Sequence, residues 1–519
     1  MRPARLSFLL SLISFCFAQC PIYSSYASQK HEPFSKGGLN LSYARPIAPC
    51  RTFVSQEVED TIERLRHVIA DPDMFRVFEN TWPSTLDTTI AWQGYANSTS
   101  EKNEPATKEK EELTFIITGD IEAMWLRDSA NQLQAYVSVL KPSNSQNSLA
   151  SLFRGAINLQ ARYILESPFC NAFQAPDESG IQRTSSANSD RIKPAFDFMR
   201  VFSCQWELDS VASFLQLSAD YADATKDYDF FKNSSNWSKA VELILRTAES
   251  MMIDSYTVDG EWQHTPYTYC APYGGTPINN CNGSPHKGHI GLVRSFHRPS
   301  DDACTFQYLI PSNMMFSAAL NTSSSIMEAI SPPSSNLTSW MRNMSTLLNR
   351  GIEAYGIVNS ASHGRVYAYE VDGYGSANVM DDPNIPSLLS APFLHYTTLH
   401  DPIYANTRRK ILSRDSPYFS QGPIISGIGS PHTLPGRAWP MSLIMRILTS
   451  EDEDEILENL SMLVRSTDGL GVMHESVDSR HPGVWSRQWF SWANGLFGVM
   501  VLDLERRRPH LLGMRLRGA

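Results

Sequence analysis

Several common signatures of function are missing from this 519-residue chain. No basic run is longer than Arg506–Arg508, the net charge is −10 and the pI is near 5.7. Both features argue against a nucleic-acid-binding protein. C-x-x-C and H-E-x-x-H spacings are absent, which argues against a zinc site. The chain also lacks the G-x-G-x-x-G of nucleotide-binding loops and the G-x-S-x-G of serine hydrolases.

Long apolar runs are missing too, except at the N-terminus. Arg2 and Arg5 precede an apolar run over 6–18, which is short for a membrane span. A basic start, a short apolar run and the small residue Ala18 predict a signal peptide over residues 1–18. The alternative is a retained signal anchor. We therefore expect a protein of the secretory pathway, extracellular or in the cell wall, that leaves the membrane after cleavage.

Glycosylation motifs and cysteines are consistent with this location. Of eight cysteines, Cys16 would leave with the signal peptide, so at least one of the other seven is unpaired unless Cys20 is also removed. Cys270 and Cys281 flank a loop rich in Gly, Pro and Asn, and we predict that they pair. N-x-S/T sequons, which predict a glycoprotein, begin at nine residues: Asn40, Asn97, Asn233, Asn236, Asn282, Asn321, Asn336, Asn343 and Asn459.

Amphipathic helical patterns recur from residue 51 onward, and strand-like alternation is confined to 114–118 and 366–371. No linker separates two cores. We predict one all-α domain over 51–507, a toroid of paired helices with functional residues in the loops at one end. An extended leader over 19–50 would precede it, and a C-terminal tail over 508–519 would follow. The predicted helices lie within 54–69, 126–140, 149–164, 208–215, 236–252, 313–330, 337–355, 386–397, 436–449, 452–465 and 487–507.

Six stretches combine carboxylates, arginine or histidine with aromatic residues: 118–131, 298–306, 369–382, 427–433, 473–476 and 485–494. This combination suits a sugar-binding site. Charged groups can chelate vicinal hydroxyls, aromatic rings stack on sugar faces, and two carboxyls can perform acid and base catalysis.

Each stretch also has a structural explanation. Arg127 and Asp128 could form an ion pair that holds a helix end. The two aspartates before Pro383 could start a helix, because Asp caps helices and Pro suits the first turn. His474 beside Glu475 could be half of a metal site, although no second histidine follows at the required spacing.

Five blocks, in a fixed order over roughly residues 50–505, resemble glycoside hydrolase family 125: GDIEAMWLRDSANQ, RPSDDAC, YEVDGYGSANVMDDPNIPSLL, GIGSPHT and MHES. The resemblance implies an (α/α)6 barrel and removal of terminal α-1,6-linked mannose from mannan or N-glycans. It also implies inversion at the anomeric carbon and no metal or other cofactor. We expect a secreted, fungal-like eukaryotic member whose partner is a mannose-containing oligosaccharide or glycoprotein.

The resemblance further points to an aspartate of RPSDD as the general acid and to Glu475 as the general base. We choose Asp302 as the acid, because the apolar run after it can bury the carboxyl and favour its protonated form. Asp301 would then bind a sugar hydroxyl, Arg298 or the backbone. The other residues expected to line the mannose pocket are Trp125, Arg127, Asp128, Asn313, Asp381, Asp382, His432, His474 and Trp489.

Two other functions are compatible with this sequence. One is a noncatalytic mannan-binding protein of the cell wall that reuses the same fold. The other is a calcium-dependent mannosidase of the second (α/α) type, which cuts α-1,2 links. A mannosidase assay separates the first alternative from an enzyme, and a chelator separates the second.

Overall fold

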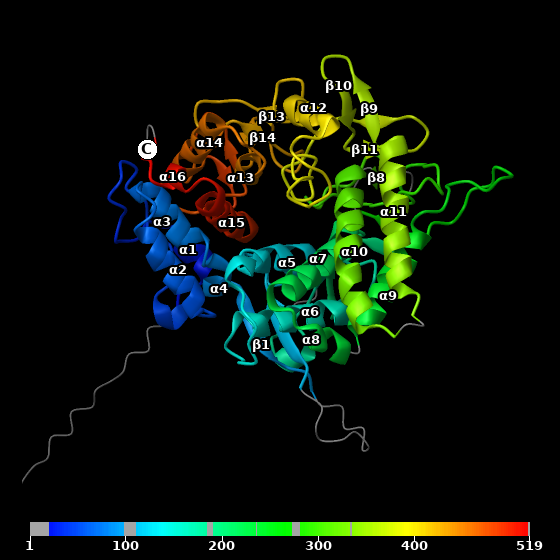
Figure 1. Cartoon of the computed structure of the whole chain (residues 1–519), viewed down its shortest axis with the longest axis horizontal. Coiled ribbons are helices and arrows are strands. Elements are labelled where there is room, and N and C mark those ends of the chain that lie inside the picture. Colours follow the sequence, from blue (N-terminus) through cyan, green and yellow to red (C-terminus); the bar gives the residue numbers. More distant parts are fainter. Residues whose placement is uncertain are drawn as a thin grey trace, which may run out of the picture.

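Helices are the dominant regular element of the computed structural model, which describes residues 20–97, 110–183, 190–234, 236–271, 281–332 and 335–516. Figure 1 shows the helices arranged around a ring in which the first described helices (blue) lie beside the last ones (red). Near the C-terminus, α15 (Ser491–Arg507) packs against α3 (Pro72–Thr81) and α5 (Leu126–Gln134). The predicted signal peptide lies outside the described residues.

Most predicted helices are present, with ends set by local signals. In α2, Ser55 caps the first turn by accepting the Val58 amide, and acidic and basic residues occupy the ends that complement the helix dipole. The other helices that correspond to predicted stripes are α6 (Leu149–Glu166), α7 (Leu208–Thr225), α9 (Trp237–Ser250), α10 (Ile310–Ile330), α11 (Leu337–Tyr355), α13 (Pro440–Leu448) and α14 (Glu453–Arg465), with α2 itself spanning Gln56–Arg66.

The structure corrects one helix prediction and adds others. The segment 386–397 forms turns, because Pro386 and Pro392 lack the amide hydrogens that a helix would use. The helix α3 was not predicted, although Asp71 caps it and Pro72 occupies its first position, both of which are helix-start signals. It also missed α12 (Pro402–Ile411) and the short helices α1 (Tyr23–Ala27), α4 (Ser84–Thr88), α8 (Tyr228–Asn233) and α16 (Pro509–Leu512).

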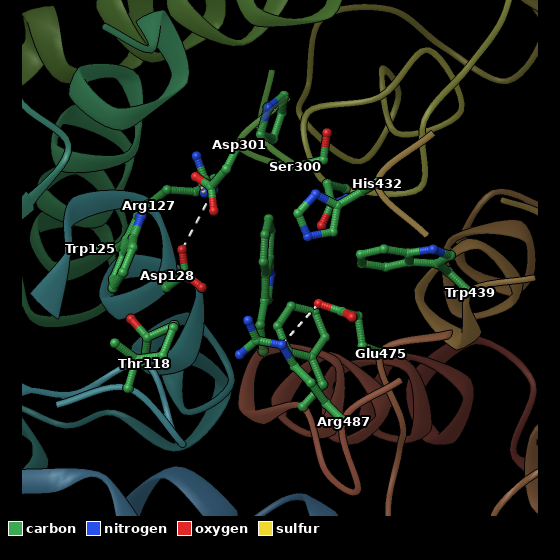
Figure 2. A pocket seen from close by; sticks show the side chains of 15 residues that line it. Thr118, Trp125, Arg127, Asp128, Ser300, Asp301, His432, Trp439, Glu475 and Arg487 are labelled. Atoms are coloured by element: carbon green, nitrogen blue, oxygen red, sulfur yellow. Dashed lines mark ion pairs between the residues drawn. The ribbon is translucent and has the colours of Figure 1, made fainter. Parts of the chain in front are cut away.

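Strands are short and antiparallel, and several of them lie where the chain enters a helix. Thus β3 (Met124–Trp125) leads into α5, and β8 (Tyr308–Leu309) leads into α10. Residues at such junctions meet at one pocket (Figure 2). The sheets are β1–β2 (Ile90–Tyr95, Glu112–Ile116), β10–β9 (Gly364–Tyr367, Ile357–Ser360), β5–β7 (Arg191–Lys193, Thr268–Cys270), β13–β14 (Phe419–Ser420, Gly427–Ile428), β3–β4–β6 (with Ala172–Phe173 and Val201–Ser203), β12–β11–β8 (Ala377–Asn378, Glu370–Val371) and β15–β16–β17 (Arg437–Ala438, Ser476–Asp478, Trp485–Ser486).

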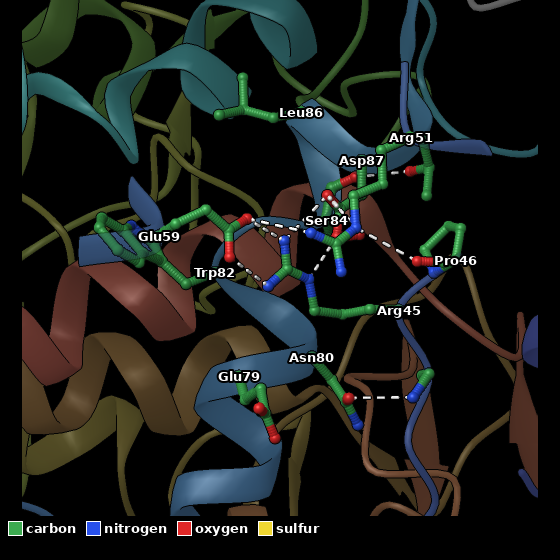
Figure 3. Close-up of polar contacts among 12 residues, drawn as sticks. Arg45, Pro46, Arg51, Glu59, Glu79, Asn80, Trp82, Ser84, Leu86 and Asp87 are labelled. Atoms are coloured by element: carbon green, nitrogen blue, oxygen red, sulfur yellow. Dashed lines mark hydrogen bonds and ion pairs between the residues drawn. The ribbon is translucent and has the colours of Figure 1, made fainter. Parts of the chain in front are cut away.

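Residues 20–50, expected as an extended leader, pack onto the helical domain. Arg45 is buried, and its guanidinium donates to Asp87 over 2.7 Å and to Glu59 over 2.5 Å (Figure 3). Because Asp87 is itself buried, removing Arg45 would leave this carboxylate with Arg51, at 3.6 Å, as its remaining ion-pair partner. A disulfide between Cys20 and Cys50 joins the first described residue of this segment to its last, and so closes the segment on itself.

The C-terminal tail packs in the same way. Leu511 and Leu512 of α16 are buried, and the amide of Leu516 donates to Asp71 over 3.0 Å. The predicted domain boundaries at residues 50 and 507 are therefore not structural boundaries, because the N-terminal segment and the C-terminal tail share one core with the helical domain.

The cysteine predictions can be compared directly with the structure. The Cys270–Cys281 disulfide is confirmed. Cys170 and Cys204 also pair, and Cys304 is the free, buried cysteine of the described part of the chain. Among the sequons, Asn459 is fully buried on α14, so it cannot carry a glycan in the folded protein. None of the helices within the described ranges is long and apolar enough to cross a membrane.

Candidate active site

A pocket opens where the helix-entry loops meet (Figure 2). It brings together six of the predicted residues: Trp125, Arg127, Asp128, Asp301, His432 and Glu475. The rest of its lining consists of Thr118, Ile121, Pro299, Ser300, Asn384, Trp439, Arg487, Phe490 and Trp492.

The loop that carries the paired aspartates is held from behind by a buried ion pair. Arg298 donates to Glu370 over 2.6 Å, and Glu370 also accepts the amides of Thr305 and Phe306. The Arg298 guanidinium therefore pairs with Glu370 and not with the Asp301 carboxyl, although the Asp301 amide donates to the Arg298 carbonyl over 2.9 Å. Asp301 has a left-handed backbone with φ of 65°, which is uncommon outside glycine and occurs often at active sites. This conformation places its carboxyl in the wall of the pocket.

Arg127 lies at the base of this wall and is almost completely buried. Its Nη1 donates to Glu207 over 2.6 Å and to Asp209 over 3.0 Å, while Nη2 lies 3.6 Å from Asp301. The Nε of Arg127 lies 3.5 Å from Asp128. Burial raises the pKa of Asp128 to about 6, with Asp301 adding to the rise and Arg127 opposing it. The Arg127–Asp128 pair is thus both an ion pair at a helix start and part of the pocket lining.

Glu475 occupies another wall, just before β16. Its Oε1 lies 3.0 Å from the Nε of Arg487, whose Nη1 donates to Asp120 over 2.5 Å. Arg487, like Asp301, has a left-handed backbone, with φ of 51°. Asp120 and Arg487 therefore hold the Glu475 carboxylate from one side and leave its other side to the pocket.

Asp302 points away from Asp301 and toward His432. The His432 Nδ1 lies 3.3 Å from Asp302 Oδ1, and Ser300 donates to Oδ2 over 3.2 Å. The hydrogen bond with Asp302 raises the pKa of His432 to about 8. A second hollow of about 780 Å³ adjoins the pocket and shares His432 and Glu475 with it; its other lining residues are Pro431, Thr433, Leu434, Pro435, Arg437 and Ser486.

Three residues that were predicted to line the pocket, Asn313, Asp381 and Asp382, lie behind it instead. Asn313 is buried and exchanges hydrogen bonds with the backbone of Val293. Asp381 is buried and accepts the amides of Leu388 and Leu389, so it orders the turns at 386–397. Burial raises the pKa of Asp381 to about 8.

Asp382 does not line the pocket itself but contacts a residue that does. It accepts the Ser430 hydroxyl over 2.6 Å and the side chain of Asn384 over 2.9 Å. Asn384 lines the pocket, so the contribution of Asp382 is to position a neighbour.

His474 and Trp489 are also buried next to the site. His474 stacks on Trp485 with ring centroids 4.5 Å apart, and burial lowers its pKa to about 4. Trp489 packs edge-on against Tyr23 of the N-terminal segment, at 4.8 Å. The described residues contain no group of three or more His, Cys, Asp or Glu arranged to hold a metal ion.

Sequence reasoning missed several residues that shape the site. Arg487 and Trp492 lie in the polar-aromatic stretch 485–494, from which only Trp489 was predicted to line the pocket. Glu207 and Asp209 lie at the start of α7, where acids commonly stabilise the helix dipole, so their position along the chain gave no signal of a functional role. The arrangement as a whole offers carboxyls on two walls, a buried arginine and flat aromatic faces, which suit acid and base catalysis on a sugar.

Comparisons with known proteins agree with this chemistry. The family model for metal-independent alpha-mannosidases, GH125, matches residues 71–502. The meiotically up-regulated gene 157 protein of Schizosaccharomyces pombe is 44% identical over 498 residues, which are 95% of this chain and 94% of that protein. A metal-independent alpha mannosidase from Streptococcus pneumoniae, solved in a non-productive complex with α-1,6-mannobiose, gives a TM-score of 0.74 at 31% identity, over 89% of this chain and 100% of that one. The chain therefore belongs to GH125, the family of metal-independent α-mannosidases.

Proposed function

We propose that this protein is an exo-acting enzyme that removes terminal α-1,6-linked mannose from mannan or N-glycans with inversion. The observation that carries the proposal is the placement of Asp301 and Glu475 on opposite walls of one pocket (Figure 2). Inverting glycosidases need two carboxyls separated widely enough to admit a water molecule. The linkage is supported by the α-1,6-mannobiose in the Streptococcus pneumoniae structure.

In the proposed reaction, the acid gives its proton to the glycosidic oxygen while the bond from C1 to that oxygen breaks. Glu475 takes a proton from water, and the water oxygen bonds to C1 from the opposite face. The products are β-mannose and the shortened glycan. Arg127 and Asp128 are placed to bind ring hydroxyls, and Trp125 and Trp492 offer faces for the sugar ring.

The geometry leads us to propose Asp301, rather than Asp302, as the acid. Asp301 lines the pocket, whereas Asp302 accepts a hydrogen bond from His432. Both oxygens of Asp302 are occupied, Oδ1 by His432 and Oδ2 by the Ser300 hydroxyl, so neither is left to face the glycosidic oxygen. In this arrangement Asp302 positions His432 at the junction with the second hollow, which has room for the rest of the glycan.

The two aspartates can be separated by substitution. Asp301→Asn is expected to lose most activity on α-1,6-mannobiose and to retain more on an aryl mannoside with an activated leaving group, which needs little protonation. Asp302→Asn is expected to lose less on mannobiose. If Asp302→Asn were inactive on mannobiose and Asp301→Asn fully active, the original choice of Asp302 would stand.

Secretion is proposed on separate grounds. Three disulfides are formed by the described residues, and disulfides persist in oxidising compartments. The N-terminal sequence has the pattern of a signal peptide. Mass analysis of protein from the culture medium and from cells tests secretion. A form that stays intracellular and starts at Met1 would contradict secretion.

We also propose that the ring of helices is an (α/α)6 barrel.

A linkage panel tests the proposed activity. Purified protein is incubated with α-1,2-, α-1,3- and α-1,6-mannobiose in the presence of EDTA, with Glu475→Gln as the inactive control. We expect mannose from the α-1,6 isomer at an undiminished rate. Cleavage of the α-1,2 isomer that requires calcium would favour a calcium-dependent mannosidase. No cleavage by the wild-type protein would favour a mannan-binding protein.

A further inference from the structure

Four carboxyl groups surround the single guanidinium of Arg127. They belong to Asp128, Glu207, Asp209 and Asp301, with nitrogen–oxygen distances between 2.6 and 3.6 Å. One positive charge cannot neutralise four ionised carboxyls. Three of these carboxyls, on Asp128, Glu207 and Asp209, are buried, whereas the Asp301 side chain is 39% exposed. Because unpaired buried charge is costly, the buried carboxyls of this cluster retain bound protons.

The positions of two oxygens indicate where one proton is held. Glu207 is buried, and its Oε2 accepts from Arg127 and from Ser210. Within the described residues, its Oε1 and the Oδ1 of Asp301 are buried and receive no hydrogen bond from any donor. The two carboxyls are nevertheless neighbours, because they lie against the two terminal nitrogens of the same guanidinium, Glu207 at Nη1 and Asp301 at Nη2, and they interact with each other. Two carboxyl groups can share a hydrogen bond only if one of them is protonated.

The surroundings favour a retained proton. Burial raises the pKa of Glu207 well above its usual range, and the nearby charges of Asp301 and Asp209 add to the rise while Arg127 opposes it. His297 also faces Asp301, and burial lowers its pKa to about 4, so it adds no positive charge at neutral pH. The other titratable groups that face this pair are Asp128, Tyr267, Tyr269, Cys304 and His432.

We propose that Glu207 is a positioning residue that shares a proton with Asp301 and so keeps that acid able to donate at a pH where Glu475 is ionised. The inference rests on the proposed role of Asp301. In each turnover Asp301 gives its proton to the glycosidic oxygen as the bond from C1 breaks, and it regains a proton from solvent. Glu207 transfers nothing to the sugar. Because the two groups interact, they titrate as a pair, and losing the last shared proton ends activity on the alkaline side.

The pH profile of kcat/KM tests this role, measured with a simple α-mannoside whose leaving group is poor and needs protonation. In Glu207→Gln no carboxyl remains with which Asp301 can share a proton, and the new amide can donate a hydrogen bond to the Asp301 carboxylate instead. The alkaline limb is expected to move down by about one pH unit or more, which near neutral pH is about a tenfold loss. A residue that only held Arg127 in place would lower kcat/KM at every pH without moving the limb.

Asp209→Asn is the matched control, because Asp209 also binds Arg127 but pairs with Ser312 on its other side. It is expected to move the limb by less than half as much. If Glu207→Gln fails to fold, Glu207→Asp keeps the charge next to Arg127 and withdraws the carboxyl from Asp301, so a downward shift is still expected. An unmoved limb in a folded Glu207 variant would overturn the inference.

Failure of the proposed function has a different signature. If Asp301 is not the acid, Asp301→Asn loses the same fraction of activity on an aryl mannoside with an activated leaving group as on this mannoside, because no proton donor has been removed. If Asp301→Asn is inactive and the alkaline limb of Glu207→Gln coincides with the wild type, only the role of Glu207 is wrong. A wild-type protein that cleaves no α-mannoside would overturn both proposals.

Discussion

The Nε of Arg487 lies 3.0 Å from the Oε1 of Glu475, and the arginine reaches it from a left-handed backbone conformation. An uncommon backbone conformation at Arg487, which holds the catalytic candidate Glu475, indicates that the fold accepts local strain to fix the position of this carboxylate. The ion pair is partly solvent-exposed on the arginine side, since the Arg487 side chain is 28% exposed. Its main effect should therefore be on catalysis rather than on stability.

Arg487→Ala is expected to lower kcat by about 10- to 100-fold, because Glu475 loses the contact that orients it. The melting temperature should change little. Steady-state kinetics and thermal unfolding measure the two effects. Arg487→Lys, which keeps the charge but not the planar donor geometry, should lie in between. An unchanged kcat in Arg487→Ala would show that Glu475 is held by other contacts.

Arg127→Ala should behave in the opposite way and unfold easily. Arg127 is 2% exposed and hydrogen-bonds the buried carboxyls of Glu207 and Asp209. Breaking a buried ion pair from one side costs about 3–5 kcal/mol. Denaturant unfolding measures this loss, with Arg487→Ala as the comparison in the same pocket. A loss below about 1 kcal/mol would mean that the carboxyls are neutral without Arg127.

Asp381 provides a test of a structural role in a residue first expected to bind the sugar. Asp381→Asn can accept one of the two amides of Leu388 and Leu389, but its own NH2 group faces the other. It should lose about 1–3 kcal/mol of stability while KM for mannobiose stays near the wild-type value. Asp128→Asn, in the pocket lining, should raise KM instead. A raised KM with normal stability in Asp381→Asn would return Asp381 to the binding site.

The ion pair of His432 with Asp302 should stabilise the protein only at lower pH. The hydrogen bond with Asp302 raises the pKa of His432 to about 8 in the folded protein, above its usual value of about 6.5. The extra stability is therefore complete below pH ~6.5 and is lost as the pH rises through about 8. The melting temperature of the wild type should exceed that of His432→Gln at pH 6, and the difference should shrink by pH 9. A constant difference would mean that no charged pair forms.

The sequence predicted what depends on short-range patterns. Apolar stripes located α6, α10 and α11, and the loop between Cys270 and Cys281 identified their disulfide. Motif blocks placed Arg127 and Glu475 at the site. Such features depend on neighbours along the chain, which a single sequence displays directly.

The remaining features depend on contacts between distant segments. Arg127 and Glu207 are 80 positions apart, and no local pattern pairs them. Asp381 and Asp128 are both acids in polar-aromatic blocks, yet one accepts buried amides and the other lines the pocket. The choice between Asp301 and Asp302 likewise depends on a left-handed backbone at Asp301, which neither residue type nor spacing indicates.

The anomer released first tests the central claim most directly. A proton NMR time course on α-1,6-mannobiose follows the anomeric signals of free mannose before mutarotation mixes them. With Asp301 and Glu475 as acid and base on opposite sides of the bond, β-mannose should appear first and α-mannose should follow slowly. Initial release of α-mannose would mean retention through a covalent intermediate, and the two-carboxylate inverting account would be wrong.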